Sequence, residues 1–306
     1  MAHNVLRVGQ RVIDVSNEDK VFFPADGITK LDIVLYYREI ARKMVHLARD
    51  HPLVMQRFPD GIGGEGFFQK NASDYFPDWL QKVSIEKQGG EVNHVILHDA
   101  ATLVYLADQA CLTPHIWLSR KGKLNFPDRL MFDLDPGDKF EEARRIARKL
   151  RDFLDGLGLE SFVMTTGSKG VHVVVPLDER SDFDTVRAFA RDVAEVIASG
   201  DREHVTTEQR INKRQGRIYI DTLRNAYAQT AVAPYAVRAK PGAPVATPVE
   251  WREIERGKLL PTQFTIKNIF QRLRKKDPWA RFSRHAYSLK NARRRLDDQF
   301  ANITRG

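Results

Sequence analysis

The segment from Arg129 to Gly137 reads Arg-Leu-Met-Phe-Asp-Leu-Asp-Pro-Gly and carries two carboxylates, Asp133 and Asp135, within an apolar run. On a β-strand, residues with this spacing point to the same face. Aspartate is depleted in strands, and neighbouring negative charges repel, so the pair is unfavourable unless a cation compensates it. A divalent metal ion is the simplest candidate, and the run predicts a strand that ends at a polar site.

Two other interpretations of this segment stay open. Asp-Pro-Gly often ends a strand, and Asp135 would then bond only its own backbone. A phosphohydrolase with an aspartate nucleophile also begins at such a pair of aspartates. Those enzymes usually carry Thr or Val shortly after the second aspartate, where this chain has Pro136 and Gly137. The rest of the chain has to decide between these interpretations.

The composition is that of a globular protein with a basic excess. The 306 residues, 42% of them hydrophobic, are enough for one large domain or two smaller ones. The formal net charge is +9, from 49 basic and 40 acidic residues. This excess favours a polyanionic partner, although basic surfaces also serve solubility.

Cysteine content and hydropathy indicate the cellular setting. The single cysteine, Cys111, lies in an apolar stretch, so one chain forms neither a disulfide framework nor a cysteine-based zinc site. We expect a buried, inert thiol. No run approaches the ~18 to 20 apolar residues of a membrane span. These features predict a soluble protein in the reducing cytoplasm.

The predicted helices and strands indicate an α+β fold with a largely antiparallel or mixed sheet, because hairpin-linked strands interrupt any strict β-α-β alternation. Apolar residues recur at helical steps, and Thr29 with Asp32 has the spacing of a capping box. The expected helices are Thr29 to Asp50, Phe140 to Leu157 and Asp182 to Ala198, and the expected strands are Glu160 to Thr165, Val171 to Pro176 and Arg217 to Asp221.

The C-terminal part is expected to begin with an exposed loop at Ala239 to Pro248 and to continue as a basic helical segment from Thr262. Aromatic residues are interspersed among the basic ones of this segment. They either form a nucleic-acid surface or pack the segment onto the core. The aromatic residues are Phe270, Trp279, Phe282 and Tyr287.

The loop Gly167-Ser-Lys-Gly-Val-His172 joins two predicted strands and offers backbone amides, a hydroxyl, an ammonium and an imidazole. These groups suit phosphate binding, although the spacing is not that of a Walker motif. A plain hairpin with turn glycines and a solvated lysine is the alternative. His172 weighs against it, because a polar ring just inside a strand needs a partner.

A third carboxylate, Asp221, ends a predicted strand and is flanked by Arg214, Arg217 and Arg224. By itself it could be an ion-pair partner. Three strand-end carboxylates together with a Ser, Lys and His loop form the set that metal-assisted phosphoryl transfer needs. Hard oxygen ligands fit magnesium or manganese better than zinc.

Four motifs in this order resemble the archaeo-eukaryotic primase superfamily and, more closely, the polymerase domain of bacterial DNA ligase D, an end-joining repair enzyme. The resemblance extends from Asn17 to the basic C-terminal segment. It implies a primase-like catalytic core with mixed or antiparallel sheets flanked by helices. The motifs are Phe132 to Gly137, Gly167 to His172, Ile220 to Asn225 and Ala233 to Arg238.

The resemblance implies roles for residues around the nucleotide. Asp133, Asp135 and Asp221 match the catalytic metal-binding triad, which would hold two divalent ions, Mn²⁺ or Mg²⁺. Arginines near the nucleotide would stabilise developing phosphoryl charge. The residues that match nucleotide-binding positions are Ser168, Lys169, His172, Arg214, Arg238 and His115.

The resemblance also implies contacts to DNA in the N-terminal part. Asn17, Lys20 and Lys30 match a pocket for the 5′-phosphate at the downstream side of a gap, and Arg57, Phe67 and Phe68 match template-binding positions. Stacking of aromatic rings on template bases tolerates any sequence. Adjacent strand residues face opposite sides, so one of the two phenylalanines can belong to the core.

The chain departs from the family's pattern at two positions. Gln56 stands where some relatives carry a lysine, which puts one phosphate contact in doubt. Arg224 stands where some relatives have a glutamine, so its contacts to primer or nucleotide are open. Neither departure affects the three carboxylates.

The expected activity is primer-dependent addition of nucleotides at DNA breaks and gaps. By resemblance the enzyme would prefer ribonucleotides over deoxyribonucleotides, favour manganese and also make untemplated additions. Its expected partners are gapped or broken DNA with a 5′-phosphate, NTP or dNTP, the bacterial Ku end-binding protein and a DNA ligase. A catalytically silent DNA-end-binding module and a primer-independent primase remain the alternatives.

The expected organisation is one primase-polymerase domain over residues 1–306. Within it, residues 1–115 would supply the 5′-phosphate and template contacts, residues 116–240 the catalytic core, and residues 241–306 a basic helical segment. Whether the chain is a stand-alone polymerase or a domain of a larger ligase stays open.

Overall fold

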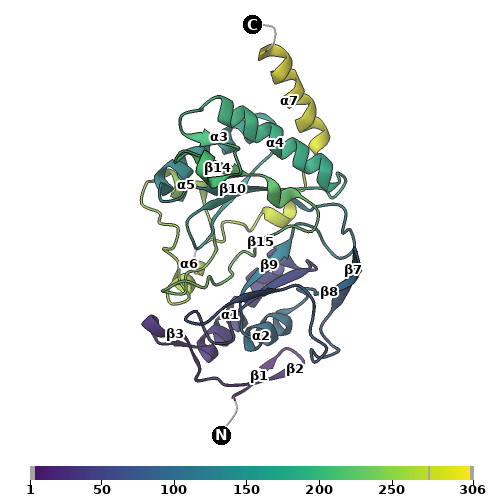
Figure 1. Cartoon of the computed structure of the whole chain (residues 1–306), viewed down its shortest axis with the longest axis vertical. Helices are drawn as coiled ribbons and strands as arrows, with labels where there is room; N and C mark the ends of the chain where they lie inside the picture. Colours follow the sequence, from purple (N-terminus) through teal and green to yellow (C-terminus); the bar gives the residue numbers. More distant parts are fainter. Residues whose placement is uncertain (1–3, 275, 304–306) are drawn as a thin grey trace. The chain divides into compact units, whose positions relative to one another are not determined.

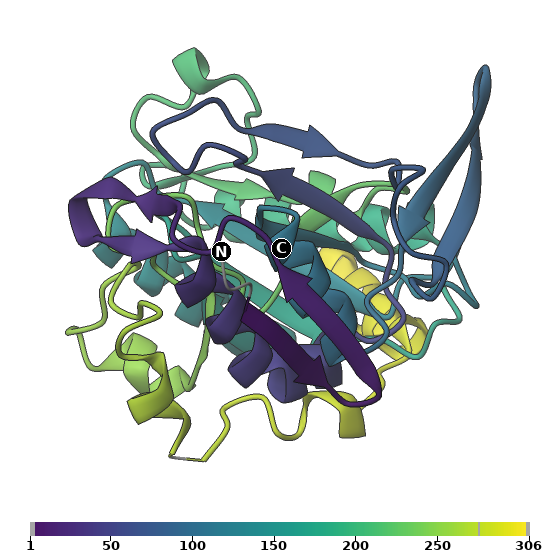
Figure 2. The same ribbon diagram turned by 90° about the horizontal axis from the view of Figure 1, so that it is seen from below.

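The computed structural model describes residues 4–274 and 276–303, and Figures 1 and 2 show it in two views. The chain forms two compact units, each assembled from separate stretches of sequence. The first unit comprises Met1–Gly122, Thr230–Thr247 and Phe264–Lys275, and the second comprises Lys123–Gln229, Pro248–Gln263 and Lys276–Gly306. The division into residues 1–115, 116–240 and 241–306 stays a prediction, because compactness does not test where a functional domain ends.

The first unit is built on a four-stranded antiparallel sheet with the order β15-β9-β5-β6. Helices α1 and α2 pack against each other in this unit (Figure 1). A short helix, α6, completes it. The strands are β5 (Leu53–Arg57), β6 (Phe67–Gln69), β9 (Cys111–Trp117) and β15 (Thr230–Val232), and the helices are α1 (Lys30–Ala48), α2 (Ala100–Asp108) and α6 (Ile269–Leu273).

Helix α1 confirms the prediction of a helix after Thr29. The Thr29 side chain accepts a hydrogen bond from the Asp32 backbone N–H, and the Asp32 carboxylate accepts one from the Thr29 N–H, which completes the capping box. Such a cap contributes about 1 kcal/mol. The apolar stripe of α1 is buried. Cys111 is buried as expected, and burial raises the pKa of its thiol to about 12.

Three two-stranded hairpins lie outside the main sheet of the first unit. One of them extends from the unit as a long arm (Figure 2). Within the described residues, no helix is both long and apolar enough to cross a membrane. The hairpins are β1 (Asn4–Val8) with β2 (Arg11–Val15), β3 (Val21–Phe23) with β4 (Ile28–Thr29), and the arm β7 (Lys82–Lys87) with β8 (Gly90–Val95).

The second unit is built on a six-stranded sheet with the order β13-β14-β10-β12-β11-β16. Strand β13 pairs with β14 in parallel, whereas β10, β11, β12 and β14 form antiparallel pairs, so the sheet is mixed and the predicted α+β class is confirmed. The strands are β10 (Arg129–Asp135), β11 (Phe162–Thr165), β12 (Val171–Pro176), β13 (Val205–Thr206), β14 (Ile218–Asp221) and β16 (Thr247–Val249).

Helices α3 (Phe140–Gly156) and α4 (Phe183–Ser199) pack against this sheet and confirm two further predicted helices (Figure 1). Strand β10 explains the packing, because Leu130, Phe132 and Leu134 are fully buried and alternate with the two aspartates. Alternation along a strand puts these apolar side chains on one face and the aspartates on the other. The helices therefore pack on the face of β10 opposite the aspartates, and Arg129 and Met131, which share the aspartates' face, are also buried.

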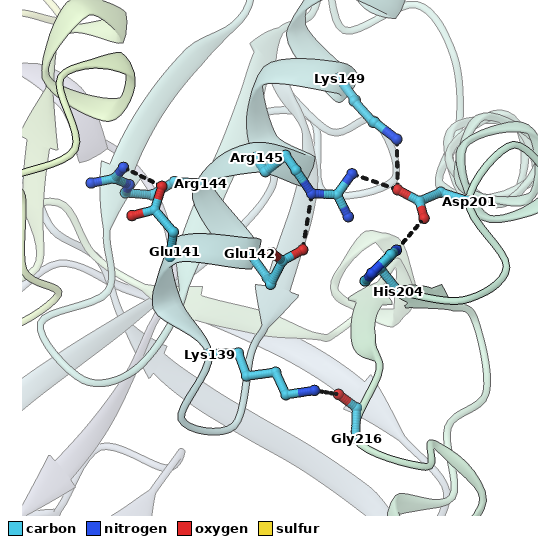
Figure 3. Close-up of polar contacts among 9 residues, drawn as sticks. All are labelled: Lys139, Glu141, Glu142, Arg144, Arg145, Lys149, Asp201, His204 and Gly216. Atoms are coloured by element: carbon cyan, nitrogen blue, oxygen red, sulfur yellow. Dashed lines mark hydrogen bonds and ion pairs between the residues drawn. The ribbon is translucent and has the colours of Figure 1, made fainter.

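A polar cluster around Asp201 ties α3 to the segment that follows α4 (Figure 3). The Asp201 carboxylate accepts hydrogen bonds from Arg145 (2.6 Å), Lys149 (2.6 Å) and His204 (2.7 Å). Burial alone would raise the pKa of Asp201, but these three donors outweigh it and hold that pKa well below its ordinary value. Lys139, just before α3, donates to the carbonyl of Gly216, just before β14.

The segment around residues 239–248 is not the exposed loop that its composition suggests. Residues 243–249 are buried, and backbone hydrogen bonds join Val245 to Phe264 and Ala246 to Ala236. Proline and alanine are common in loops, but both can be buried once the backbone groups around them are paired. The prediction was wrong because it used composition without those partners.

The aromatic residues of the C-terminal segment are used for packing. Trp279 and Phe282 are buried and stack at 4.8 Å between ring centroids, and the indole N–H of Trp279 donates to the carbonyl of Val163. Within the described residues, the helices of this segment are α5 (Trp251–Glu255), α7 (Leu289–Ile303) and a 3-10 turn at Phe282–Arg284 in the second unit, and α6 in the first. Of the two alternatives for these rings, the structure favours packing.

Candidate active site

Strand β10 brings the three predicted carboxylates to one face of the second unit's sheet. Asp133 lies opposite Asp221 on β14 and opposite His172 on β12. Directly opposed residues on antiparallel strands have neighbouring side chains, roughly 5 Å apart at Cβ. Asp135 lies on the same face because it is two residues further along β10. We call the face that carries Asp133, Asp135, Asp221 and His172 the acidic face.

Each carboxylate of the acidic face has a cationic or imidazole neighbour. Arg214 donates to Asp135 at 3.1 Å, Arg224 donates to Asp221 at 3.2 Å, and the Nε2 atom of His172 lies 3.5 Å from Asp133. These neighbours provide the compensation that clustered negative charges require. Within the part of the chain that the structure describes, no group of three or more His, Cys, Asp or Glu side chains has the arrangement of a metal site.

The expected turn after β10 is present, but Asp135 is not used by the turn alone. Gly137 has a φ of +60°, and Lys139 N–H donates to the carbonyl of Pro136. The Asp135 carboxylate instead accepts from Arg214, whose guanidinium lies 4.0 Å from the ring centroid of Tyr219. The turn therefore ends the strand and leaves the carboxylate available to a cation.

Tyr219 is a residue of the acidic face that the sequence analysis missed. It lies opposite Asp135 in the register, and its hydroxyl is 3.4 Å from Asp221. Burial and the neighbouring Asp221 raise the pKa of Tyr219 to about 12, so the phenol stays neutral. A tyrosine two residues before a strand-end aspartate was the only sequence signal.

The loop between β11 and β12 begins beside the acidic face. Thr166 and Gly170 close it by reciprocal hydrogen bonds. A Cβ atom on Gly170 would lie 2.5 Å from the carbonyl oxygen of Leu134 and 3.6 Å from a carboxylate oxygen of Asp133. Only glycine fits this approach, which brings the loop against β10 next to Asp133. The loop is a hairpin turn, as the alternative interpretation held, and it lies next to the acidic face.

Two polar side chains of this loop are exposed to different degrees. Lys169 is exposed and forms an ion pair with Asp138 at 2.8 Å. That hydrogen bond raises the pKa of Lys169 and lowers the pKa of Asp138. Ser168 is partly exposed. A solvent-facing ammonium paired with a surface carboxylate can exchange that partner for a phosphate at small cost.

His172 is buried in the acidic face, with 3% of its surface exposed. Its Nε2 atom lies 3.5 Å from Asp133, which supplies a partner of the kind that a polar ring inside a strand needs. Its Nδ1 atom is buried and has no hydrogen-bond partner among the described residues. A buried polar atom without a partner costs about 1 to 3 kcal/mol.

Asn225 holds β10 in place where its neighbour β14 ends. The Asn225 side chain accepts from the Met131 N–H at 2.8 Å and donates to the Met131 carbonyl at 2.7 Å, and it is fully buried. The amide thus continues the hydrogen-bond ladder that β14 provides to Asp133 and Asp135. Asparagine is depleted in strands, so only its place in the motif could have drawn attention to it.

In the first unit, the predicted 5′-phosphate residues come together at the N-terminus of α1. The Lys20 N–H donates to the Asn17 carbonyl, and the Lys30 N–H donates to the Lys20 carbonyl. Asn17 adopts a φ of +47°, which asparagine tolerates better than most residues. We call the group of Asn17, Lys20 and Lys30 the α1 corner.

The two lysines of the α1 corner differ in exposure. The Lys20 ammonium pairs with Asp60 at 2.6 Å, and its side chain is 40% exposed. The Lys30 ammonium pairs with Asp108 at 2.7 Å, also donates to Ser16, and is 5% exposed. Lys20 therefore faces solvent, whereas Lys30 is held inside the unit.

The predicted template residues lie at the edge strand β6 and its neighbour β5. Phe67 and Phe68 are 45% and 60% exposed, so neither belongs to the core, which the sequence had left open for one of them. An edge strand of three residues leaves both of its faces uncovered. Phe68 contacts His115 at 5.5 Å between ring centroids, and Arg57 lies 5.7 Å from the Phe67 ring.

The remaining predicted positions are partly exposed. Arg238 belongs to the first unit, where its backbone N–H donates to the carbonyl of Pro244. His115 is on β9, opposite Val54 of β5. Gln56, the first departure from the family's pattern, lies opposite Phe68. Arg224, the second departure, is the cation that binds Asp221.

Sequence comparison places the chain among end-joining proteins. It is 34% identical over 246 residues to the multifunctional non-homologous end joining protein LigD of Mycolicibacterium smegmatis, a match that covers 79% of this chain and 32% of that protein. It is 32% identical to the bifunctional non-homologous end joining protein LigD of Bacillus subtilis, over 84% of this chain and 42% of that protein. The chain thus spans a third to less than half of the length of these relatives.

Structural comparison agrees with this placement. The polymerase domain of Mycobacterium tuberculosis ligase D, solved in complex with DNA, matches with a TM-score of 0.85 at 31% identity, over 91% of this chain and all of that chain. Residues 29–279 match the family model of the LigD primase-polymerase domain. This chain therefore belongs to the LigD primase-polymerase domain family.

Proposed function

We propose that this chain adds nucleotides to the 3′-hydroxyl of a DNA primer at breaks and gaps, with release of pyrophosphate and with a preference for ribonucleotides. Family membership supports a nucleotidyltransferase of end-joining repair. The observation that carries the proposal is the acidic face, where Asp133 lies directly between Asp221 and His172 in the strand register. A binding module without catalytic activity has no use for three carboxylates beside a phosphate loop.

The residues around the acidic face have separate roles in this proposal. The β11-β12 loop binds the triphosphate through Ser168 and Lys169, and His172 donates a hydrogen bond to it. Arg214 and Arg238 stabilise the negative charge that develops on the transferred phosphoryl group and on pyrophosphate. His115 contacts the nucleotide. The exposure of Lys169 and the position of His172 beside Asp133 support these assignments.

The three carboxylates fit magnesium or manganese by their chemistry, since both ions prefer hard oxygen ligands. Asp133, Asp135 and Asp221 would hold two such ions, which would activate the primer hydroxyl and neutralise the triphosphate. Asp135 is more than half exposed, and Arg224 is 38% exposed, so their present ion pairs can open toward solvent. On binding, Arg214 and Arg224 would exchange their carboxylate partners for phosphate oxygens.

The first unit would hold the DNA. The exposed ammonium of Lys20 supports a 5′-phosphate contact at the α1 corner, together with Asn17 and Lys30. The exposed rings of Phe67 and Phe68, with Arg57, support stacking on template bases. The relatives are named as end-joining proteins. This chain would act in that process together with the Ku end-binding protein and a DNA ligase, the partners that the family resemblance implies.

Primer extension on gapped DNA tests the proposal. The substrate carries a 5′-phosphate at the downstream side of the gap, and ATP or dATP is supplied with either Mg²⁺ or Mn²⁺. We expect extension by a small number of nucleotides, faster with ATP and with Mn²⁺. If the chain binds the DNA but extends no primer under any condition, the polymerase proposal is wrong and the chain is an end-binding module.

A further inference from the structure

A row of aromatic rings and arginines runs across the first unit beyond the predicted template residues. It lies on the Phe67 side of β6, because neighbouring strand residues face opposite sides and Phe68 points with His115 to the other. We call this row the aromatic-arginine surface. Its members are Arg57, Phe67, Tyr75, Tyr105, Trp79 and Arg11.

Arg57 joins the first two rings of this surface. Its guanidinium lies 5.7 Å from the Phe67 ring and donates to the Tyr75 hydroxyl at 3.3 Å. The guanidinium also donates to the side chain of Gln69 and to the carbonyl of Gln109, and both hydrogen bonds are 2.7 Å long. These bonds fix its position. Tyr75 itself is 63% exposed, so its ring faces solvent beside a fixed cation.

The surface continues from Tyr75 through edge-to-face contacts. The buried ring of Phe76 contacts Tyr75 at 5.1 Å and Tyr105 at 5.5 Å between centroids, and Tyr105 contacts Trp79 at 5.7 Å. At the far end, the guanidinium of Arg11 lies 5.3 Å from the Trp79 ring. The row thus has Arg57 between Phe67 and Tyr75, and it ends with Arg11 beside Trp79.

The charged residues around this surface favour single-stranded over double-stranded nucleic acid. Asp74 and Asp78 are exposed in the same loop as Tyr75 and Trp79, so the area is not a broad basic patch. A duplex presents phosphates and hides its bases, and it would meet these carboxylates without compensation. A single strand offers base faces to the rings, while its phosphates reach Arg57 and Arg11.

We propose that the aromatic-arginine surface binds single-stranded nucleic acid, as a continuation of the template path beyond Phe67 and Phe68. Tyr75 stacks on a base, and Arg57 holds both the tyrosine hydroxyl and a phosphate of the same strand. This inference rests on the proposed function for its substrate. It adds a binding surface for the unpaired strand that a resected end or a wide gap exposes.

Fluorescence anisotropy with a labelled oligodeoxythymidylate about 12 nucleotides long tests this surface. A duplex of the same length and label is the comparison. We expect Tyr75→Ala to weaken single-strand binding about tenfold, as loss of one stacked base predicts. We expect Tyr75→Phe, which keeps the ring and loses only the bond to Arg57, to stay within about threefold of the parent chain.

Tyr227→Ala is the matched control, because Tyr227 is an exposed tyrosine of the second unit and lies outside the surface. Equal affinity of the parent chain and Tyr75→Ala for the single strand overturns the inference. So does an equal loss on single strand and duplex. If the chain binds single strands but does not extend primers, the polymerase proposal fails and this surface stands. If the chain extends primers but Tyr75→Ala does not change single-strand affinity, this surface fails and the polymerase proposal stands.

Discussion

The acidic face and the α1 corner are both organised by ion pairs, but the pairs differ in exposure. Lys30 and Asp108 are almost completely buried, with 5% and 6% of their side chains exposed. Asp135 pairs with Arg214, and 54% of the Asp135 side chain is exposed. Lys20 pairs with Asp60, and their side chains are 40% and 75% exposed. A buried pair is costly to break, whereas an exposed pair contributes little and can exchange its partner.

This difference in exposure separates the charged residues that hold the fold from those that can bind a ligand. Lys30 fixes the chain around Ser16 and Asp108, so its main contribution is to the shape of the α1 corner. Lys20 and Lys169 are available to a phosphate because their present partners are solvent-facing. Asp135 is available to a cation because 54% of its own side chain is exposed. Lys20 and Lys30 match the same predicted pocket, but one ammonium is exposed and the other is buried.

The largest expected effect is on catalysis at the acidic face. Asp133→Asn keeps the shape of the side chain and removes its charge, so nucleotide addition should fall by at least ~10³-fold, while DNA binding persists. Primer extension and DNA affinity measure the two quantities. Asp152→Asn, an exposed aspartate of α3, is the control. Retained synthesis in Asp133→Asn would remove the metal-site interpretation.

The next effect concerns the buried pair of the α1 corner. Asp108→Ala leaves the Lys30 ammonium buried without its carboxylate, which should lower the free energy of unfolding by about 3 to 5 kcal/mol. Urea denaturation measures the change. Asp60→Ala removes the exposed partner of Lys20 and should change stability by less than ~1 kcal/mol. Similar losses in the two variants would contradict the distinction between them.

The Asp201 cluster should show an intermediate effect with a defined pH dependence. The folded pKa of Asp201 is lowered, so its stabilisation is present above the unfolded pKa of about 3.9 and is lost as the pH falls below it. Asp201→Asn should therefore lower stability by roughly 2 kcal/mol near neutral pH and much less in acid.

Thermal melts across this pH range measure the effect of Asp201→Asn. Asp138→Asn is the matched control, because the pKa of Asp138 is also lowered but its side chain is 92% exposed. We expect the melting temperature of Asp138→Asn to stay close to that of the parent chain at any pH. A loss in Asp201→Asn that is the same in acid and at neutral pH would show that the carboxylate charge is not what stabilises the cluster.

The smallest expected effect is at the exposed lysine of the α1 corner. Lys20→Ala should weaken binding to gapped DNA about fivefold, roughly 1 kcal/mol, only when the gap carries a 5′-phosphate. Lys121→Ala is the control, since Lys121 is 39% exposed and also pairs with an aspartate. An equal loss of affinity with and without the 5′-phosphate would contradict the assignment of Lys20 to the pocket.

Much of the architecture could be predicted from local patterns. The capping box at Thr29 and the apolar periodicity of α3 and α4 are properties of short segments, and they identified these helices. The ordered motifs identified the family. The exposed-loop prediction at residues 239–248 was wrong, and the exposure of both Phe67 and Phe68 could not be predicted, because burial depends on partners that are distant in sequence.

The sequence by itself determined the order of chemical groups in this protein: the strand-end carboxylates, the Ser, Lys and His loop, and the alternation that puts Asp133 and Asp135 on one face. Only the tertiary structure decided which charges are available. Register placed Asp133 between Asp221 and His172, and packing buried Lys30 while leaving Lys20 exposed. Exposure sets the local dielectric and the cost of exchanging a partner, and it is a property of the assembled fold.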